Sequence, residues 1–131
     1  MKKAFILVCD DEPGIRESLR LILEQEYNLS FVGHGKEAVD YVRKHRPDLT
    51  IMDIKMPTLN GLEALRRIKR ARPETRVLMI TGYESSDVAV EATKYGADDY
   101  LTKPFERERV KEKVEHLLAL PKIRRKRFFF F

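Results

Sequence analysis

The sequence has few of the features that mark secreted or membrane proteins. Cys9 is the only cysteine, so no internal disulfide can form and nothing indicates an oxidising compartment. No apolar run approaches the roughly 18 residues of a membrane span, and the opening MKKAFILVCDDE becomes acidic too early for a signal peptide. We therefore expect a cytoplasmic protein.

Two common classes of functional motif are absent as well. The three histidines, His34, His45 and His116, lack the spacing of metal ligands, which argues against a zinc site. No G-x-x-x-x-G-K-[ST] phosphate-binding loop occurs, which argues against a P-loop nucleotide hydrolase. We expect the histidines to be ordinary surface or packing residues.

Cationic residues are in excess, with a formal charge of +5, but the excess lies near the C-terminus. Five of the 26 lysines and arginines fall between Lys122 and Arg127, and the other 21 balance the 21 acidic residues. We expect one domain over residues 1–120 and a basic, Phe-rich tail over residues 121–131, which ends in Phe128–Phe131. A solvated end or linker is the expected role of the tail, and contact with phosphates or an anionic membrane surface stays open.

Short apolar runs alternate with amphipathic, helix-period segments along the chain. Such uninterrupted apolar runs are typical of strands in a parallel sheet that is covered on both faces. The pattern predicts an α/β fold, with a doubly wound, five-stranded parallel sheet and five helices. The predicted strands are residues 4–9, 29–33, 49–53, 76–80 and 99–103.

Residues that start and stop helices agree with this alternation. Pro13 suits a first helical turn, Asn60-Gly61 a turn before the third helix, and Gly96 a helix end. Ser85 or Ser86 is the expected cap of the fourth helix.

Polar side chains follow four of the five predicted strands. The first strand leads to Asp10 and Asp11, the third ends at Asp53, the fourth leads to Thr81, and the fifth leads to Lys103. Because function in open parallel sheets gathers at the carboxyl ends of the strands, we expect these residues to converge.

The chemistry of this group indicates phosphoryl transfer assisted by a metal. Three carboxylates in one pocket repel one another and so either take up protons or bind a cation. Oxygen ligands alone favour a hard ion such as Mg²⁺. With Asp53 as nucleophile, the cation and the Lys103 ammonium neutralise phosphoryl oxygens, and the Thr81 hydroxyl bonds one of them.

The chain resembles the receiver domains of two-component response regulators, such as the single-domain chemotaxis receiver. The resemblance covers about residues 4–119 and rests on CDDE (9–12), IMDIKMPTLNG (51–61), ITG (80–82) and ADDYLTKPF (97–105). It implies a flavodoxin-like fold with strand order 2-1-3-4-5.

The resemblance also implies a role for each residue of the site. Asp53 would accept a phosphoryl group from a histidine kinase or phosphotransfer protein. Asp53 and Asp11 would ligate Mg²⁺ together with the backbone carbonyl of Lys55, and Asp10 would act mostly through a bound water. Lys103 would pair with the phosphoryl oxygens.

A second set of implied roles concerns the response to phosphorylation. Thr81 would bond the phosphoryl group, Tyr100 would turn inward behind it, and the peptide bond before Pro104 would be cis. The surface of the fourth and fifth helices and the strand between them would change and signal to a downstream partner or output domain. Lys55 and Tyr83, two residues beyond Asp53 and Thr81, are hypothesised to prolong the lifetime of the phosphoryl group.

The resemblance describes a switch that catalyses only its own phosphorylation and dephosphorylation, not an enzyme with an external substrate. Direct DNA binding by this chain is not expected, since no DNA-binding domain fits after the fifth helix. The kinase, the output and phosphorylation-dependent dimerisation stay open, as does whether the chain stands alone or is a piece of a larger regulator.

Three alternatives compete with this interpretation. One is a receiver fold that acts without phosphorylation. Another is a dinucleotide-binding domain, because GHGKEA places Gly33 and Gly35 in a G-x-G-x-x-A pattern twenty residues before Asp53. This pattern follows the second strand, however, and leaves the acidic residues unexplained. The third is an aspartyl-phosphate phosphatase, which Lys55 disfavours because it occupies the place of the required acid.

Overall fold

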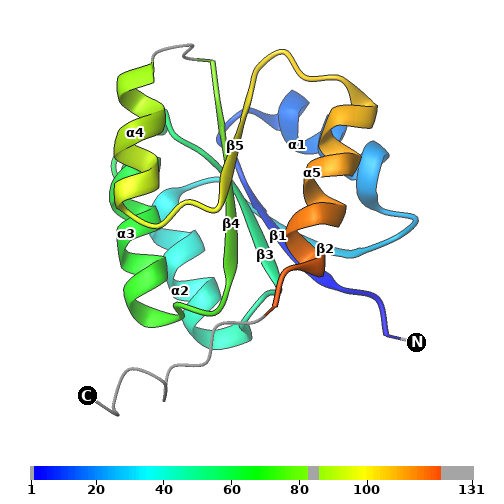
Figure 1. The fold of residues 1–131 in the computed structure, drawn as a ribbon, viewed down its shortest axis with the longest axis horizontal. Helices are drawn as coiled ribbons and strands as arrows, with labels where there is room; N and C mark the ends of the chain where they lie inside the picture. Colours follow the sequence, from blue (N-terminus) through cyan, green and yellow to red (C-terminus); the bar gives the residue numbers. More distant parts are fainter. Residues whose placement is uncertain (1, 83–85, 122–131) are drawn as a thin grey trace.

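Five parallel strands form one sheet, and a helix follows each strand (Figure 1). The computed structural model describes residues 2–82 and 86–121. The strands are β1 (Phe5–Cys9), β2 (Asn28–Val32), β3 (Leu49–Asp53), β4 (Arg76–Thr81) and β5 (Asp99–Thr102), in the spatial order β2-β1-β3-β4-β5. The helices are α1 (Pro13–Leu23), α2 (Gly35–His45), α3 (Gly61–Ala71), α4 (Ser86–Lys94) and α5 (Arg107–Ala119). This confirms the predicted fold class and strand order.

The predicted strand ends are correct to within one residue. The register pairs Phe5 with Asn28 and Cys9 with Val32, so β1 and β2 start and stop together. Pairing between neighbours therefore sets the ends, whereas the sequence shows only apolar character. Predictions at Tyr83, at Ser85 and in the tail after Pro121 lie outside what the structure describes. The other predicted cap residue, Ser86, is the first residue of α4.

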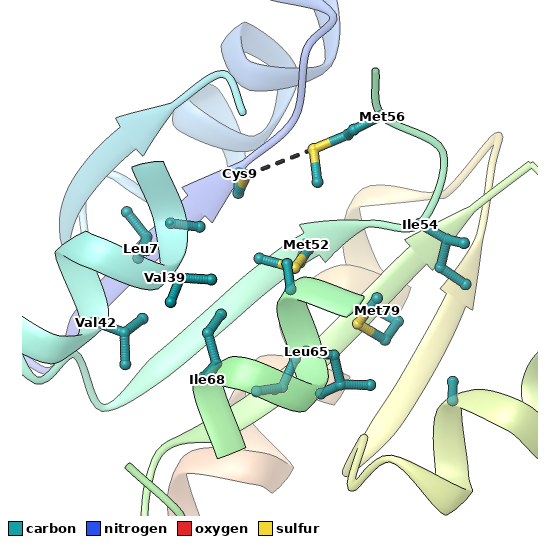
Figure 2. Packing of buried hydrophobic residues seen from close by; sticks show 14 residues of the cluster. Leu7, Cys9, Val39, Val42, Met52, Ile54, Met56, Leu65, Ile68 and Met79 are labelled. Atoms are coloured by element: carbon teal, nitrogen blue, oxygen red, sulfur yellow. Dashed lines mark hydrogen bonds between the residues drawn. The ribbon is translucent and has the colours of Figure 1, made fainter. Parts of the chain in front are cut away.

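Helices cover both faces of the sheet, which explains the apolar runs. In Figure 1, α2, α3 and α4 lie on one side and α1 and α5 on the other. Each layer encloses its own core, and Figure 2 shows the one beneath α2 and α3. Cys9 belongs to this core, where its thiol lies 3.6 Å from Met56 Sδ and burial raises its pKa to about 12. Cys9 is thus a small residue buried in β1.

The turn from β3 to α3 packs directly against the strand that ends at Asp53. A Cβ atom on Gly61 would lie 2.1 Å from the Asp53 carbonyl oxygen, and the Gly61 amide donates to Ile54 O at 2.7 Å. Asn60 caps α3, because its side chain accepts a hydrogen bond from Glu63 N at 3.0 Å. Glycine is therefore required at position 61, because only glycine lets α3 begin so close to the end of β3.

Packing also accounts for a glycine in the dinucleotide-like pattern. A Cβ atom on Gly35 would lie 2.6 Å from the carbonyl oxygen of Leu59 and 3.3 Å from the Ala64 Cβ. Gly35 thus permits close contact between the start of α2 and the region where α3 begins. Within the described ranges, none of the helices combines the length and the apolar character needed to cross a bilayer.

Candidate functional site

The ends of β1 and β3 place two aspartates side by side at one edge of the sheet. Asp10 follows the last residue of β1, and Asp53 is the last residue of β3. Their exposed fractions are only 2% and 3%. Burying two carboxylates is unfavourable unless cations or hydrogen bonds compensate.

Two more acidic residues complete a cluster around this pair. Carboxylate oxygens of Asp10, Asp11, Glu12 and Asp53 all lie within 4.8 Å of one another. Asp11 and Glu12 are exposed, so the cluster is open to solvent on one side. The convergence expected for Asp10, Asp11 and Asp53 is thus present in the structure.

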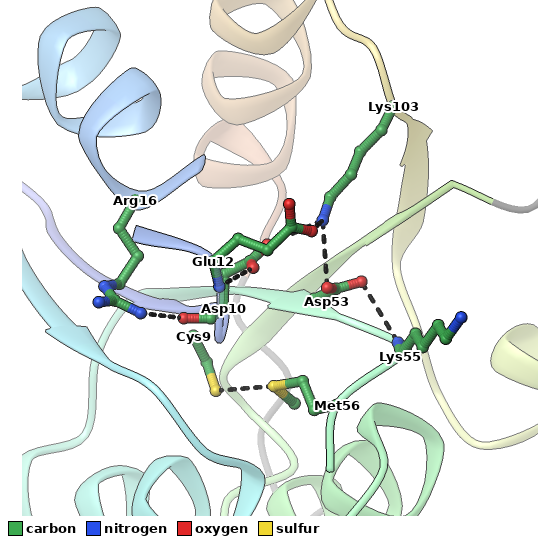
Figure 3. Close-up of polar contacts among 8 residues, drawn as sticks. All are labelled: Cys9, Asp10, Glu12, Arg16, Asp53, Lys55, Met56 and Lys103. Carbon is green, nitrogen blue, oxygen red and sulfur yellow. Dashed lines mark hydrogen bonds and ion pairs between the residues drawn. The ribbon is translucent and has the colours of Figure 1, made fainter. Parts of the chain in front are cut away.

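Lys103 provides the positive charge in this cluster (Figure 3). Its Nζ lies 3.2 Å from Asp10 Oδ2, 3.0 Å from Glu12 Oε1 and 3.1 Å from Asp53 Oδ2. Because β5 ends at Thr102, Lys103 lies one residue beyond the strand, and its backbone amide donates to Thr81 O at 2.7 Å. This hydrogen bond holds Lys103 at the sheet edge, while its side chain reaches across to β1 and β3.

Burial and mutual repulsion shift the protonation of the two buried aspartates. Desolvation raises the pKa of Asp53, and the nearby charge of Asp10 raises it further against the opposing effect of Lys103. Desolvation also raises the pKa of Asp10, although hydrogen bonds from the Glu12 amide and Lys103 oppose it. Burial alone would lower the pKa of Lys103, but its contacts with Glu12, Asp53 and Asp10 raise it. The site therefore holds more negative charge than one lysine compensates.

Backbone groups hold the two buried carboxylates in fixed orientations. Glu12 N donates to Asp10 Oδ1 at 2.9 Å, and Lys55 N donates to Asp53 Oδ1 at 3.3 Å. Figure 3 shows the Lys55 side chain pointing away from the acidic cluster. Only the main chain of Lys55 thus faces Asp53, which is compatible with the carbonyl role implied by the resemblance.

The remaining predicted residues lie on β4 and β5. Thr81 is fully buried and follows Ile80, the register partner of Asp53, so it lies at the same sheet edge. Tyr100 is partly buried and packs against the core of the α2–α3 layer, so it lies behind the acidic cluster and outside it. The Lys103–Pro104 peptide bond is cis, at the position that the resemblance implied.

Two residues that the sequence analysis did not assign to the site make contact with it. Glu12 pairs with Lys103, and Arg16 donates from Nη1 to the Asp10 carbonyl oxygen at 2.6 Å. Glu12 had a visible signal, because it directly continues the acidic run after β1. Arg16 had none, since its contact depends on the angle between α1 and β1.

The donor set fits a hard divalent cation. All four clustered ligand groups are carboxylates, two of them are buried, and none is a histidine or thiol. A bound cation would offset the repulsion that raises the pKa of Asp53 and Asp10. Asp53 is a rigidly held carboxylate, and the Lys103 ammonium group lies 3.1 Å from one of its oxygens.

Comparison with known proteins identifies the family of this site. The response regulator receiver domain matches residues 6–115. Protein CcdB of Bacillus subtilis (strain 168) is 40% identical over 117 residues, which cover 87% of this chain and 97% of that protein. Response regulator MprA of Mycolicibacterium vanbaalenii is 38% identical over 114 residues, covering 86% of this chain but only 49% of MprA. The chain thus spans about half the length of that relative.

Solved structures agree with these relatives. A crystal structure of a CheY-like response regulator receiver domain protein from Methanospirillum hungatei JF-1 has a TM-score of 0.85 at 30% identity. The match covers 89% of this chain and 94% of that one. The family match over residues 6–115 includes the ends of β1, β3 and β5 and hence the acidic cluster and Lys103. The chain therefore belongs to the response regulator receiver domain family of two-component systems.

Proposed function

We propose that this chain is a switch that accepts a phosphoryl group on Asp53 from a histidine kinase or phosphotransfer protein. The observation that carries the proposal is the position of Asp53, a buried carboxylate at a strand end with Lys103 Nζ 3.1 Å away. Receiver domains are signalling modules rather than enzymes that turn over an external substrate. Phosphorylation of its own aspartate is accordingly the only chemistry we assign to the chain.

Mg²⁺ is the proposed cofactor, and Asp10, Asp11, Asp53 and the Lys55 carbonyl are its proposed ligands. The all-oxygen donor set and the excess negative charge support this choice. When bound, the ion supplies positive charge for the oxygens of the incoming phosphoryl group. Glu12 belongs to the same cluster, and its pairing with Lys103 identifies it as a positioning residue.

In the proposed transfer, a carboxylate oxygen of Asp53 attacks the phosphorus of a phosphohistidine. The new P–O bond forms as the P–N bond breaks, and the imidazole leaves with the electron pair and takes up a proton. The hydrogen bond from the Lys55 backbone amide to Asp53 Oδ1 fixes the rotamer of the attacking carboxylate. Lys103 Nζ already contacts Asp53 and would pair with the transferred oxygens, while the Thr81 hydroxyl would bond one of them.

The proposed output is a change in the surface formed by α4, β5 and α5. Thr81 and Tyr100 lie on adjacent strands, because the register pairs Thr81 with Thr102, two residues beyond Tyr100. A phosphoryl group that bonds Thr81 favours the state in which Tyr100 turns inward, since a ligand shifts an equilibrium only through its differential affinity. A downstream protein or output domain would read this surface, and residues 121–131 would form a tail outside the receiver domain of residues 1–120.

Intact mass spectrometry tests the function directly. The full chain is incubated with Mg²⁺ and a small acyl phosphate, with and without a chelator, beside Asp53→Asn and the control Asp40→Asn. Asp40 is exposed on α2, so its loss leaves the site intact. We expect one added phosphoryl group in the parent and the control, and none in Asp53→Asn or with chelator. No labelling of the parent would contradict the proposal and favour the phosphorylation-independent module. Labelling of Asp53→Asn would contradict Asp53 as the acceptor, and equal labelling with chelator would contradict the role of Mg²⁺.

A further inference from the structure

A cavity of about 570 Å³ lies at the edge of the sheet opposite the acidic site. It is bounded by the segment before β1, the α2–β3 and α3–β4 connections and the end of α5. Figure 1 shows the chain entering β1 and leaving α5 at this same edge. The volume falls within the range of about 300–1,000 Å³ that small-molecule sites occupy.

Cationic side chains dominate the polar part of the cavity wall. Lys2, Lys3, Arg46, Arg72 and Arg76 line it, against the acidic residues Asp48 and Glu74. Arg76 is engaged by Asp98 at 3.0 Å, and one oxygen of Asp48 accepts from the Phe5 amide at 2.8 Å. Across the described residues, Lys2, Lys3 and Arg46 form no ion pair within 4.0 Å.

Helix dipoles explain only part of this charge. Arg46 and Arg72 cap the C-termini of α2 and α3, where cations offset the partial negative charge of the helix end. Lys2 and Lys3 precede a strand and are at no helix end. Helix dipoles therefore do not explain why Lys2 and Lys3 lie at the cavity without an ion-pair partner.

Two arginines at the cavity, Arg46 and Arg72, lie in energetically unfavourable arrangements. Arg46 has φ of 50°, a left-handed conformation in which glycine is the usual residue. Arg72 donates to Arg43 O at 2.7 Å, yet its Nε is buried without a hydrogen-bond partner. Glu74 Oε2 is likewise buried without a hydrogen-bond partner.

We propose that this cavity binds a nucleoside polyphosphate. Phosphate groups match the lysine and arginine side chains that line the cavity. Leu117, Leu118 and Leu120 form an apolar wall against which a base can lie. The proposal is independent of phosphorylation at Asp53, because the cavity and the acidic cluster lie at opposite edges of the sheet.

Titration calorimetry of the full chain with ATP, in chelator and without Mg²⁺, tests the site. We expect binding of one ATP, weakened at least tenfold in Arg46→Gly and in the double variant Lys2→Ala/Lys3→Ala. Glycine adopts the left-handed conformation readily, so Arg46→Gly should remain folded, as its melting temperature will show. Arg66→Ala removes the same charge from an exposed position on α3 and should bind as the parent does.

Two further ligands separate specific from purely electrostatic binding. Adenosine tests the apolar wall alone and pyrophosphate tests the cations alone, and we expect both to bind at least tenfold more weakly than ATP. No ATP binding, or equal affinity of the parent, Arg46→Gly and the double lysine variant, would overturn the site. Equal affinity of these variants would place bound ATP outside the cavity. Pyrophosphate binding as tightly as ATP would overturn the nucleoside part of the proposal.

Discussion

Two buried threonines show how a single hydroxyl group affects this fold. Thr75 is 3% exposed, and its Oγ1 donates to the Pro47 carbonyl oxygen at 2.8 Å. Thr50 is fully buried in β3, and its Oγ1 has no hydrogen-bond partner. A buried hydroxyl without a partner loses its bonds to water and regains nothing. The same side chain is therefore stabilising at one position and costly at the other.

Replacing each threonine by valine should change stability in opposite directions. Thr50→Val removes the unpaired hydroxyl and keeps the shape, so the free energy of unfolding should rise by about 1 kcal/mol. Thr75→Val leaves the Pro47 carbonyl unpaired and should lower it by about 1–2 kcal/mol. Urea denaturation measures both. A loss of stability in Thr50→Val comparable to that in Thr75→Val would contradict the assignment.

Asp53 is the second residue whose own environment works against stability. Desolvation and Asp10 raise its pKa in the folded protein above the unfolded value. A carboxyl group with a raised pKa contributes stability below the unfolded pKa of about 3.9, and this contribution is lost as pH rises through the folded pKa. The metal-free parent should therefore lose stability relative to Asp53→Asn between mildly acidic and neutral pH.

Thermal denaturation in chelator, across that pH range, measures this difference. At neutral pH we expect Asp53→Asn to be more stable by about 1 kcal/mol, since it removes one of several repelling charges. Lys103 keeps its pairs with Asp10 and Glu12 in the variant. The control Asp40→Asn should follow the parent. A difference between Asp53→Asn and the parent that does not grow with pH would argue against repulsion as the cause.

At the scale of elements, Asp98 joins one helix to two strands. Its carboxylate contacts Lys69 Nζ of α3 at 2.8 Å and Arg76 Nη1 of β4 at 3.0 Å. It also accepts from the Val77 amide at 2.8 Å, while its own amide donates to Val77 O at 3.0 Å. All three charged side chains are only 13–14% exposed. The contacts fix the start of β5 against β4 beneath α3.

Asp98→Ala should lower the free energy of unfolding by about 2–3 kcal/mol. It leaves Lys69 and Arg76 without their carboxylate partner and the Val77 amide without its acceptor. Asp40→Ala is the matched control. Asp40 is 61% exposed and 4.0 Å from Arg43, so its loss should change stability by less than about 0.5 kcal/mol. Chemical denaturation of both variants decides the matter, and similar small effects would show that the Asp98 contacts add little.

The elements themselves could be predicted from the sequence, but their side-chain contacts could not. Apolar runs located each strand because both faces of the sheet are covered, and the polar residues after them located the edge where the site lies. The roles of Arg16 and Asp98 were missed for a different reason. Their contacts depend on the distances between helices and strands, and no local pattern in the sequence encodes those distances.

At the scale of the whole molecule, the two edges of the sheet carry opposite charge. Four carboxylates cluster where the strands end, and five cations line the cavity where they begin. Charge counting along the sequence found a neutral body and a basic tail. That count was correct as a sum, but it concealed the separation. The clustered carboxylates come from two segments of the chain, and the cavity residues come from four.

We expect the acidic edge to make the stability of the whole domain depend on divalent cations. Binding to the folded state alone adds RT ln(1 + [L]/Kd), about 2.7 kcal/mol at a hundredfold excess over Kd. We expect Mg²⁺ to raise the melting temperature of the parent and of Asp40→Asn, but much less that of Asp53→Asn. The increase should be larger at neutral than at mildly acidic pH, because protonation of Asp53 and Asp10, whose pKa values are raised, competes with the ion. Scans at matched ionic strength measure it, and an equal increase in Asp53→Asn would place the ion elsewhere.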